Sequence, residues 1–343
     1  MAWTEPAYSR RQVDRAGTTY VDAAATPEER ELARTVINNW RSSHSFPLNT
    51  LTVNLRDGAS RFDNAPTVAQ RIKRLPSIQH KLERIPGMSL SRMQDIGGCR
   101  AVMAEAQGVQ ELVSFYKSAS RIKHRPIRED DYVSTPKESG YRGAHLVYRY
   151  YSDRKPTYNG LAVEMQIRSR LQHAWATAVE TVGTFTQQAL KSSWGDAEWL
   201  RFFALMGSAL ARREGTTLVP GTPVDNRELA DELRHLVVRL DVIDRLSAYG
   251  NALEFTEDAA ELMPGHIYLL ELDIPGESLR TRAYKNPAVA VEEYGAIERA
   301  IEGQPGKDVV LVTVESLSAL RRAYPNYFLD TTIFVESVRE AIR

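Results

Sequence analysis

The segment GLAVEMQIRSR, residues 160–170, carries polar side chains whose types and spacing could support catalysis. Side chains alternate between the two faces of a strand, so Glu164, Gln166 and Arg168 would share one face, opposite apolar neighbours. A carboxylate, an amide and a guanidinium on one rigid face could hold a cation and a polar substrate. A solvated sheet edge would give the same alternation, so the other segments must decide between these interpretations.

A group of cations lies in QRIKRLPSIQHKLER. The segment contains Arg71, Lys73 and Lys81, and Pro76 places Ser77 close to the start of a helix. Free backbone N–H groups at a helix start favour phosphate oxygens. Cations beside them could clamp a triphosphate, whereas an amphipathic helix with a hydrated basic face is the simpler alternative.

The segment QDIGGCRAVM supplies a second acid. Asp95 precedes two glycines, which let the backbone turn sharply or approach a ligand, and Arg100 begins a strand. Mg²⁺ commonly takes one or two carboxylates from a protein and its other ligands from phosphates and water. Asp95 and Glu164 are therefore candidate Mg²⁺ ligands, although a turn with an incidental acid would have the same sequence.

A glycine-rich loop in DYVSTPKESGYRGAHLVY precedes the next expected strand. It offers four side chains, Lys137, Tyr141, Arg142 and His145. An aromatic ring in such a loop can stack on a purine, and Lys and Arg side chains bind phosphates. All four segments therefore indicate one chemistry, which combines a nucleotide, Mg²⁺ and a phosphoryl-type transfer.

Length and composition bound the class of protein. With 343 residues, 43% of them apolar and 26% charged, the chain is globular and long enough for two or more packed units. No apolar run approaches the roughly 20 residues of a membrane helix, and the N-terminus lacks the apolar core of a signal peptide. Cys99 is the single cysteine. We expect a cytoplasmic protein without a disulfide or a cysteine-rich zinc site, and with neither a membrane nor DNA as partner.

The net charge of zero hides an uneven distribution. Residues 51–170 hold 21 Lys and Arg against 12 Asp and Glu, whereas the rest of the chain holds 23 against 32. A basic middle segment suits a polyanionic ligand, and an acidic remainder could lie against it.

Hydrophobic periodicity predicts the elements that position these residues. We expect helices over residues 26–45, 108–122, 168–190, 197–212, 226–249 and 287–303, two helical pieces in 67–85, and a largely helical end, 317–342. The apolar side of the first helix comprises Leu32, Val36, Ile37 and Trp40. Strands are expected over 99–105, 144–152, 266–274, 278–284 and 308–316, besides the segment described first. Residues 123–143 are read as a polar loop, and the Pro/Gly-rich 218–226 as a possible boundary.

The four segments together resemble the synthetase domain of the RelA/SpoT family, pyrophosphokinases that make alarmone nucleotides. The matching motifs are RIKRLPSIQHKL, DIGGCRAV, YVSTPKESGYRGAHL and VEMQIRSRLQHAWATAVE, in family order over about residues 65–185. The resemblance implies an α+β fold, with a nucleotidyltransferase-like mixed sheet flanked by helices. It also implies transfer of the β,γ-pyrophosphate of ATP to a ribose hydroxyl.

The resemblance assigns roles at the donor nucleotide. Arg71 and Arg100 would sandwich the adenine of ATP, and its phosphates would be held by Lys73, Ser77 and Lys81. The cofactor Mg²⁺ would bind to the two acids already named.

Roles at the acceptor follow in the same way. Glu164 would help to deprotonate the attacking hydroxyl, and Tyr141 would stack on the acceptor base. The residues around that base would be Lys137, Arg142, His145, Gln166 and Arg168. The row of polar side chains on one strand would thus present a metal ligand and acceptor contacts side by side.

The whole chain resembles the fused toxin–antitoxin branch known as CapRel. The resemblance implies a toxic synthetase domain, residues 1–249, and an inhibitory domain, residues 250–343, that is zinc-finger-like but lacks metal ligands. In YPNYF, Tyr324 and Tyr327 match the Tyr-x-x-Tyr motif of that inhibitory region. They would plug the ATP site, with Tyr324 or Tyr327 in the slot between the two arginines, although two half-buried aromatics at a helix end are the commoner interpretation.

The same resemblance implies a trigger and an acceptor. The trigger would be a phage protein, typically the major capsid protein, and opening would start abortive infection. The acceptor would be the 3′-terminal adenosine of tRNA. A basic run could follow the acceptor stem, or could be an ordinary surface; it comprises Lys117, Arg121, Lys123, Arg125 and Arg128.

Two further functions stay open. One is a small alarmone synthetase that makes ppGpp- or ppApp-type products from free GTP or ATP, and the other is an inactive nucleotide- or protein-binding module. The second is disfavoured because both acids, the cations and the loop tyrosine are all present. GTFTQQALK stands where classical synthetases place Tyr-Lys, which favours a non-standard acceptor.

Overall fold

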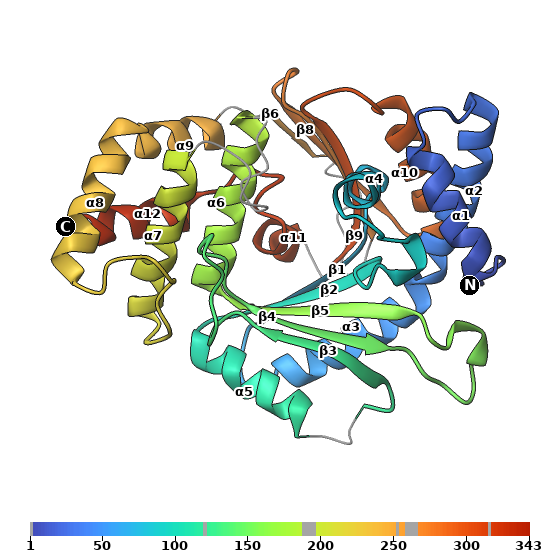
Figure 1. Cartoon of the computed structure of the whole chain (residues 1–343), viewed down its shortest axis with the longest axis horizontal. Helices are drawn as coiled ribbons and strands as arrows, with labels where there is room; N and C mark the ends of the chain where they lie inside the picture. The colour runs from blue at the N-terminus through green and yellow to red at the C-terminus, as the bar shows by residue number, and fades with distance from the viewer. Residues whose placement is uncertain (1–2, 119–121, 187–196, 252–253, 258–266, 315–316) are drawn as a thin grey trace.

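The computed structural model of the chain describes residues 3–118, 122–186, 197–251, 254–257, 267–314 and 317–343 (Figure 1). Its helices are α1 (Arg10–Val21), α2 (Pro27–Ser43), α3 (Ser45–Ala59), α4 (Leu75–Arg84), α5 (Ala106–Lys117), α6 (Arg170–Thr186), α7 (Ala197–Arg213), α8 (Asn226–Arg239), α9 (Val242–Asn251), α10 (Pro287–Ala300), α11 (Leu317–Ala323) and α12 (Thr332–Ala341). Its strands are β1 (Thr67–Ile72), β2 (Gly97–Met103), β3 (Arg125–Asp131), β4 (Ala144–Arg149), β5 (Ala162–Ser169), β6 (Glu254–Glu257), β7 (Ile267–Asp273), β8 (Ser278–Tyr284) and β9 (Lys307–Thr313).

Strands from both ends of the chain join in one mixed sheet. Within the described residues the order is β3-β4-β5-β2-β1-β9-β7-β8-β6. β2 and β5 are parallel, as are β6 and β8, and the other neighbours are antiparallel. Helices α3 and α5 cover one face of the β2–β5 region, while α4 and α11 lie above the other (Figure 1). The expectation of an α+β fold with a mixed sheet flanked by helices agrees with this arrangement.

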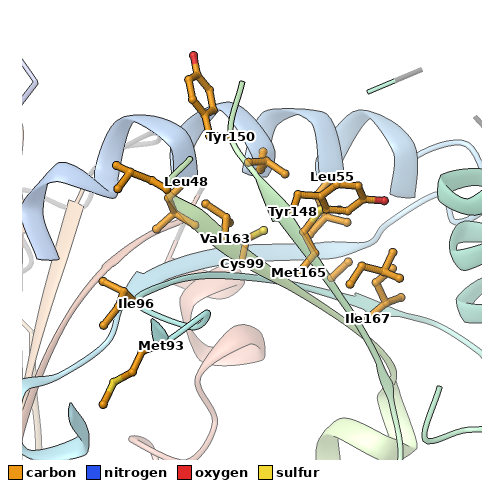
Figure 2. Close-up of a cluster of buried hydrophobic side chains, with 14 of the residues drawn as sticks. Leu48, Leu55, Met93, Ile96, Cys99, Tyr148, Tyr150, Val163, Met165 and Ile167 are labelled. Carbon is orange, nitrogen blue, oxygen red and sulfur yellow. The ribbon is translucent and has the colours of Figure 1, made fainter. Parts of the chain in front are cut away.

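The alternation predicted for residues 160–170 is present in β5. Val163, Met165 and Ile167 are fully buried in the core beneath the sheet, where Leu48 and Leu55 of α3 meet them (Figure 2). This burial fixes the register, because a shift of one residue would put the apolar side chains on the polar face. The intervening polar side chains consequently face the opposite way, towards α4 and α11.

The prediction for residues 67–85 is half wrong. The second helical piece is present as α4, with Pro76 in its first turn as expected. The first piece is the strand β1, paired with β2 on one side and with β9 on the other. Pairing on both sides satisfies its backbone hydrogen bonds, and this tertiary contact overrides the helical spacing of so short a segment.

Two further expectations are wrong. Residues 125–131 form the edge strand β3 instead of a loop, and its charged, exposed residues and proline are tolerated because only β4 pairs with it. Leu32 is 70% exposed, whereas Ile37 and Trp40 of the same helix are buried. The buried side of α2 includes Ala33, Ile37 and Trp40, and Leu32 lies on the solvent side.

The C-terminal elements form as predicted but do not stand apart. β7, α10 and β9 match their expected segments, yet β9 extends the sheet directly from β1. Phe334 and Val338 of α12 pack in a second core with α6, α7 and α9. The division into residues 1–249 and 250–343 stays a prediction, and both parts contribute to the same sheet and to this second core.

Among the described helices, none is long and apolar enough to cross a membrane.

Candidate active site

Three neighbouring strands bring the predicted donor and metal residues to one cavity. In the register of β1, β2 and β5, Arg71 lies opposite Gly98, which pairs with Glu164, and Arg100 pairs with Gln166. A cavity of about 60 Å³ opens on this face. It is lined by Ala69, Arg71, Lys73, Asp95, Gly98, Cys99, Arg100, Glu164, Gln166 and Tyr324.

Asp95 is held between two lysines. Its carboxylate oxygens accept from Lys73 Nζ at 2.8 Å and from Lys81 Nζ at 2.9 Å. Burial alone would raise the pKa of Asp95, but the two ammonium groups outweigh burial and hold the pKa well below its usual range. The acid is therefore ionised at neutral pH, and the predicted phosphate ligands Lys73 and Lys81 are oriented by it.

Glu164 has a different set of partners. Its carboxylate contacts His145 Nδ1 at 2.9 Å and accepts from Gln166 Nε2 at 2.9 Å. Burial would raise the pKa of Glu164, but the His145 contact, aided by Gln166, outweighs it and lowers the pKa. The negative charge of Asp95 acts in the opposite direction on the same carboxyl. The two acids, which lie in separate segments, thus line one cavity within electrostatic reach of each other.

These two carboxylates fit Mg²⁺ only as part of a shared ligand set. The described residues contain no group of three or more His, Cys, Asp and Glu side chains placed to hold a metal. Two carboxylates together with nucleotide phosphates and water would complete the octahedral set that Mg²⁺ requires. The donor chemistry at Asp95 and Glu164 suits this role, and the lysines on Asp95 are equally suited to phosphate.

The polar row of β5 continues into the glycine-rich loop. Arg168 donates to Gln166 Oε1 at 3.1 Å and to Tyr141 Oη at 2.8 Å, and Tyr141 also contacts His145. Lys137 Nζ lies 5.3 Å from the centre of the Tyr141 ring. Five of the six predicted acceptor residues are therefore connected in one network that ends at Glu164.

Arg142 and Ser77 are not brought into this group. Arg142 is 3% exposed and pairs with Glu214 at 3.0 Å, away from the cavity lining. Its position next to Tyr141 suggested an acceptor contact, but the chain turns it into the interior, where an ion pair satisfies it. Ser77 lies in the first turn of α4, as expected, but does not line the cavity.

Tyr324 fills the space beside Arg100. The Arg100 guanidinium carbon lies 5.3 Å from the centre of the Tyr324 ring, and Arg100 also donates to the carbonyl of Ala323. Tyr324 Oη donates to the carbonyl of Gln70 at 3.1 Å. The remaining volume of about 60 Å³ is far below the roughly 300–1,000 Å³ of small-molecule sites. The cavity is therefore too small for a nucleotide while this ring occupies it.

Tyr327 lies beside the turn between β1 and α4 and not against Arg100. Its Oη is 3.0 Å from Arg74 Nη1 and 3.0 Å from Asp308 Oδ2, and Arg74 and Asp308 also form an ion pair. The side chain is 1% exposed. Either tyrosine was a candidate for the slot beside Arg100, and Tyr324 is the one that lies there.

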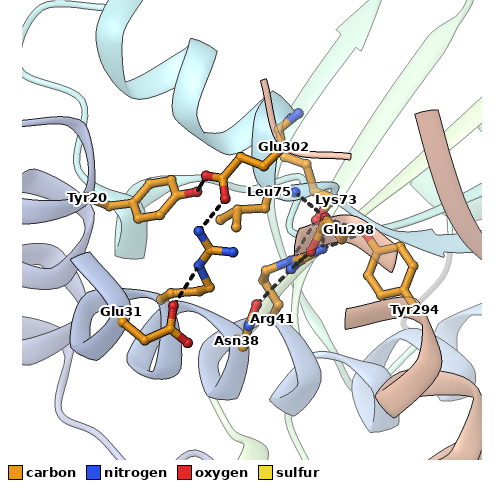
Figure 3. A network of polar contacts seen from close by, with 10 residues as sticks. Tyr20, Glu31, Asn38, Arg41, Lys73, Leu75, Tyr294, Glu298 and Glu302 are labelled. Atoms are coloured by element: carbon orange, nitrogen blue, oxygen red, sulfur yellow. Dashed lines mark hydrogen bonds and ion pairs between the residues drawn. The ribbon is translucent and has the colours of Figure 1, made fainter. Parts of the chain in front are cut away.

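Glu298 of α10 is a contact that sequence reasoning missed. Its carboxylate accepts two hydrogen bonds from the Arg41 guanidinium of α2, at 2.9 and 3.0 Å, and one from the backbone N–H of Leu75, at 2.9 Å (Figure 3). Arg41 Nε in turn donates to the carbonyl of Lys73 at 2.9 Å. Pro76 signalled the free N–H groups of this helix start, but no local signal identifies a partner 223 residues away.

Two buried arginines on this face, Arg100 and Arg168, each have an N–H group without a hydrogen-bond partner among the described residues. Burial, with repulsion from Arg168, lowers the pKa of Arg100 to about 9. Within the described part of the chain, the buried Nε groups of Arg100 and Arg168 have no hydrogen-bond partner. A buried N–H without an acceptor is costly, so an anionic ligand would be favoured here.

Comparison with known proteins places this cavity in a family. Residues 70–187, about a third of the chain, match the family model described as "Region found in RelA / SpoT proteins". Residues 70–187 are therefore similar to the region that RelA and SpoT proteins share. The matched region includes the three strands that line the cavity, apart from the first three residues of β1. Its bounds agree closely with residues 65–185, which the motifs predicted.

The chain shares between 23% and 34% sequence identity with three individual proteins. GTP pyrophosphokinase YjbM of Bacillus subtilis (strain 168) is 34% identical over 91 residues, which are 26% of this chain and 41% of that protein. A GTP pyrophosphokinase family protein from Streptococcus pneumoniae is 25% identical, with 55% of this chain and 92% of that chain covered and a TM-score of 0.42. The small alarmone synthetase 1 of Bacillus subtilis, bound to pppGpp, is 23% identical, with 54% and 94% covered and a TM-score of 0.43.

The remaining predicted contacts lie mostly on the surface or outside the described residues. Lys117 pairs with Glu129, and Arg128 with Asp130 at 2.7 Å. Arg121 lies outside the described residues, as does the GTFTQQALK segment beyond residue 186. A continuous basic track for an acceptor stem stays a prediction.

The ion pairs of Asp95 predict a pH dependence of stability. An acid whose pKa is lowered by folding stabilises the protein above its unfolded pKa of about 4, and this contribution is lost as pH falls through the lower folded pKa. Asp95→Asn should therefore lower the free energy of unfolding by about 1–3 kcal/mol at pH 7. In urea unfolding, the difference from the wild type should shrink below pH 4. A difference that is constant from pH 7 to pH 3 would contradict this assignment.

Proposed function

We propose that the chain is an ATP-dependent pyrophosphokinase toxin that its own residues 250–343 hold inactive. One observation carries the proposal: Tyr324 of the C-terminal part lies on Arg100 in the cavity that Asp95 and Glu164 share. The RelA/SpoT match supports the activity, and the position of the tyrosine supports the inhibition.

The reaction follows from the arrangement of the cavity residues. After Tyr324 leaves, adenine would lie between Arg71 and Arg100, and Lys73 and Lys81 would turn from Asp95 to the phosphates. A ribose hydroxyl attacks the β-phosphorus of ATP, the bond between the α,β-bridging oxygen and that phosphorus breaks, and AMP leaves. Glu164 is ionised and accepts the hydroxyl proton. Mg²⁺ held by Asp95 and Glu164 would neutralise phosphate charge.

Carboxylates of the C-terminal part support the inhibited state as well. Glu298 accepts the Leu75 N–H at the start of α4, and Asp308 pairs with Arg74 in the same turn. Both are groups that a triphosphate could use, because helix N-termini and guanidinium groups bind phosphate oxygens. The C-terminal part therefore competes with ATP for its phosphate contacts and for its adenine slot.

We further propose that the acceptor is the 3′-terminal adenosine of tRNA, so that activation blocks translation. The resemblance to CapRel and the basic surplus of residues 51–170 support this acceptor. The alternative acceptor is free GTP or ATP, giving ppGpp- or ppApp-type products. The names of the relatives, which include a GTP pyrophosphokinase, favour this alternative.

The proposed trigger is a phage protein, with the major capsid protein as the first candidate. A partner that binds the open form would shift the equilibrium towards it without changing the chemistry of the site. The CapRel resemblance supports this choice, and the trigger would act in anti-phage abortive infection.

Removing the Tyr324 ring should release the enzyme. A cation–π contact contributes about 0.5–2 kcal/mol, so Tyr324→Ala should raise pyrophosphate transfer roughly 2- to 30-fold and slow growth on expression. Tyr324→Phe keeps the ring and loses only the bond to Gln70, and should stay closer to the wild type. Transfer rates of the purified full-length chains measure the effect. Equal rates in all three chains would remove the inhibitory role of the ring.

The acceptor can be identified with the released chain. Tyr324→Ala incubated with γ-labelled ATP should transfer label to tRNA, and to neither GTP nor ATP, in separate reactions. Adding Glu164→Gln should abolish the label while circular dichroism shows an unchanged fold. Label in free nucleotide alone would end the tRNA proposal, and label that survives Glu164→Gln would contradict the catalytic assignment.

A further inference from the structure

A second cavity, of about 410 Å³, lies where the C-terminal part meets the RelA/SpoT-like region. Val102 of β2 and His173 of α6 contribute to one side, and Arg322 of α11 and Phe334 of α12 to the other. Its volume falls within the roughly 300–1,000 Å³ of small-molecule sites, unlike the volume left beside Tyr324. None of the roles assigned above involves this cavity.

The lining combines positive charge with an apolar wall. Three arginines, Arg170, Arg321 and Arg322, line it against one acid, Asp330. The Arg321 guanidinium carbon lies 5.4 Å from the centre of the Phe328 ring, so Arg170 and Arg322 carry the argument for phosphate binding. Side chains such as Val102 and Phe334 form the apolar part. Guanidinium groups bind phosphates in a bidentate manner, and apolar surfaces accept flat rings. A nucleotide offers both features in one molecule of suitable size.

The cavity is mechanically connected to the inhibitory tyrosine through α11. Arg322 Nε donates to Thr67 Oγ1 of β1 at 3.2 Å, and the backbone carbonyl of Arg322 lies 3.1 Å from His173 Nε2 of α6. The next residue, Ala323, accepts from Arg100, and Tyr324 follows directly. A ligand that contacts both α6 and α11 would therefore hold this helix in its inhibitory position.

We propose that this cavity binds a nucleotide through its phosphates and that the bound nucleotide stabilises the inhibited state. The cavity has walls from both parts of the chain, so its ligand binds the closed form better and shifts the population towards it. The proposal that a nucleotide binds here does not depend on the proposed function, whereas its regulatory effect rests on the proposed inhibition by Tyr324.

The binding test is a calorimetric titration of GTP into the full-length chain. Arg170→Ala should weaken GTP binding about tenfold, because hydrogen bonds to charged groups are worth 1.5–3 kcal/mol, and Arg170→Lys should weaken it less. Arg227→Ala, which removes an exposed cation of α8 that lines neither cavity, is the matched control and should leave the affinity unchanged. Lys137→Ala, at the proposed acceptor site, shows whether GTP binds there instead. Ala174→Phe fills the cavity without changing charge and should abolish binding.

Three results would overturn the site. They are the absence of GTP binding, a wild-type affinity in both Arg170→Ala and Ala174→Phe, and a loss of affinity in Lys137→Ala that matches the loss in Arg170→Ala. Inorganic pyrophosphate that binds as tightly as GTP would overturn the nucleotide assignment, because the apolar wall would then have no role. These outcomes do not depend on any transfer activity.

Trypsin tests the regulatory effect, because Arg321 and Arg322 lie in α11 itself. When opening is fast relative to cleavage, cleavage reports the open population. GTP should slow cleavage after these arginines in the wild type and not in Ala174→Phe, which cannot bind it. Unchanged or faster cleavage at saturating GTP would overturn the inhibitory direction while leaving the binding result intact.

Discussion

The pairing of β9 with β1 is the constraint on which the rest of the arrangement depends. β1 carries Arg71 on the nucleotide face, and β9 lies directly beside it, with Val312 opposite that arginine. Helix α11 follows β9 along the chain and lies above this part of the sheet, and Tyr324, directly after it, lies on Arg100 (Figure 1). The same pairing places Asp308, near the start of β9, beside the turn between β1 and α4. The strands that carry the cavity residues and the strand that leads to the two tyrosines thus belong to one sheet.

The proposed inhibited state rests on contacts of two kinds. The tyrosine ring contributes little by itself, but tethering within one chain gives it a high effective concentration. The Arg41–Glu298 pair is different, since both side chains are about 95% buried. Removing either partner would leave an unpaired buried charge and cost about 3–5 kcal/mol, whereas opening would expose both charges to water, which offsets much of the lost attraction. Under the proposal, a partner that binds the open form could therefore release the site.

The parts of the site that depend on local pattern were predictable from sequence. The alternation along β5 and the helix start at Pro76 follow from side-chain periodicity and backbone geometry, and four spaced motifs identified the domain. The features that local pattern did not predict depend on partners far away in the sequence. β1 is a strand because two other strands flank it, and Arg142 can be buried because it pairs with Glu214, 72 residues away. Glu298 had no local signal, since its function lies in contacts with the other end of the chain.

The central claim is that ATP and the C-terminal tyrosine occupy the same place and exclude each other. Amide exchange of α11 and the turn after it tests this most directly, because the Tyr324 N–H bonds to Leu320 and the Tyr327 N–H to Tyr324. A saturating non-hydrolysable ATP analogue, with Mg²⁺, should accelerate exchange at these amides in the full-length chain, as bound ligand displaces the segment. Exchange that stays unchanged or slows while the analogue is bound would contradict the account.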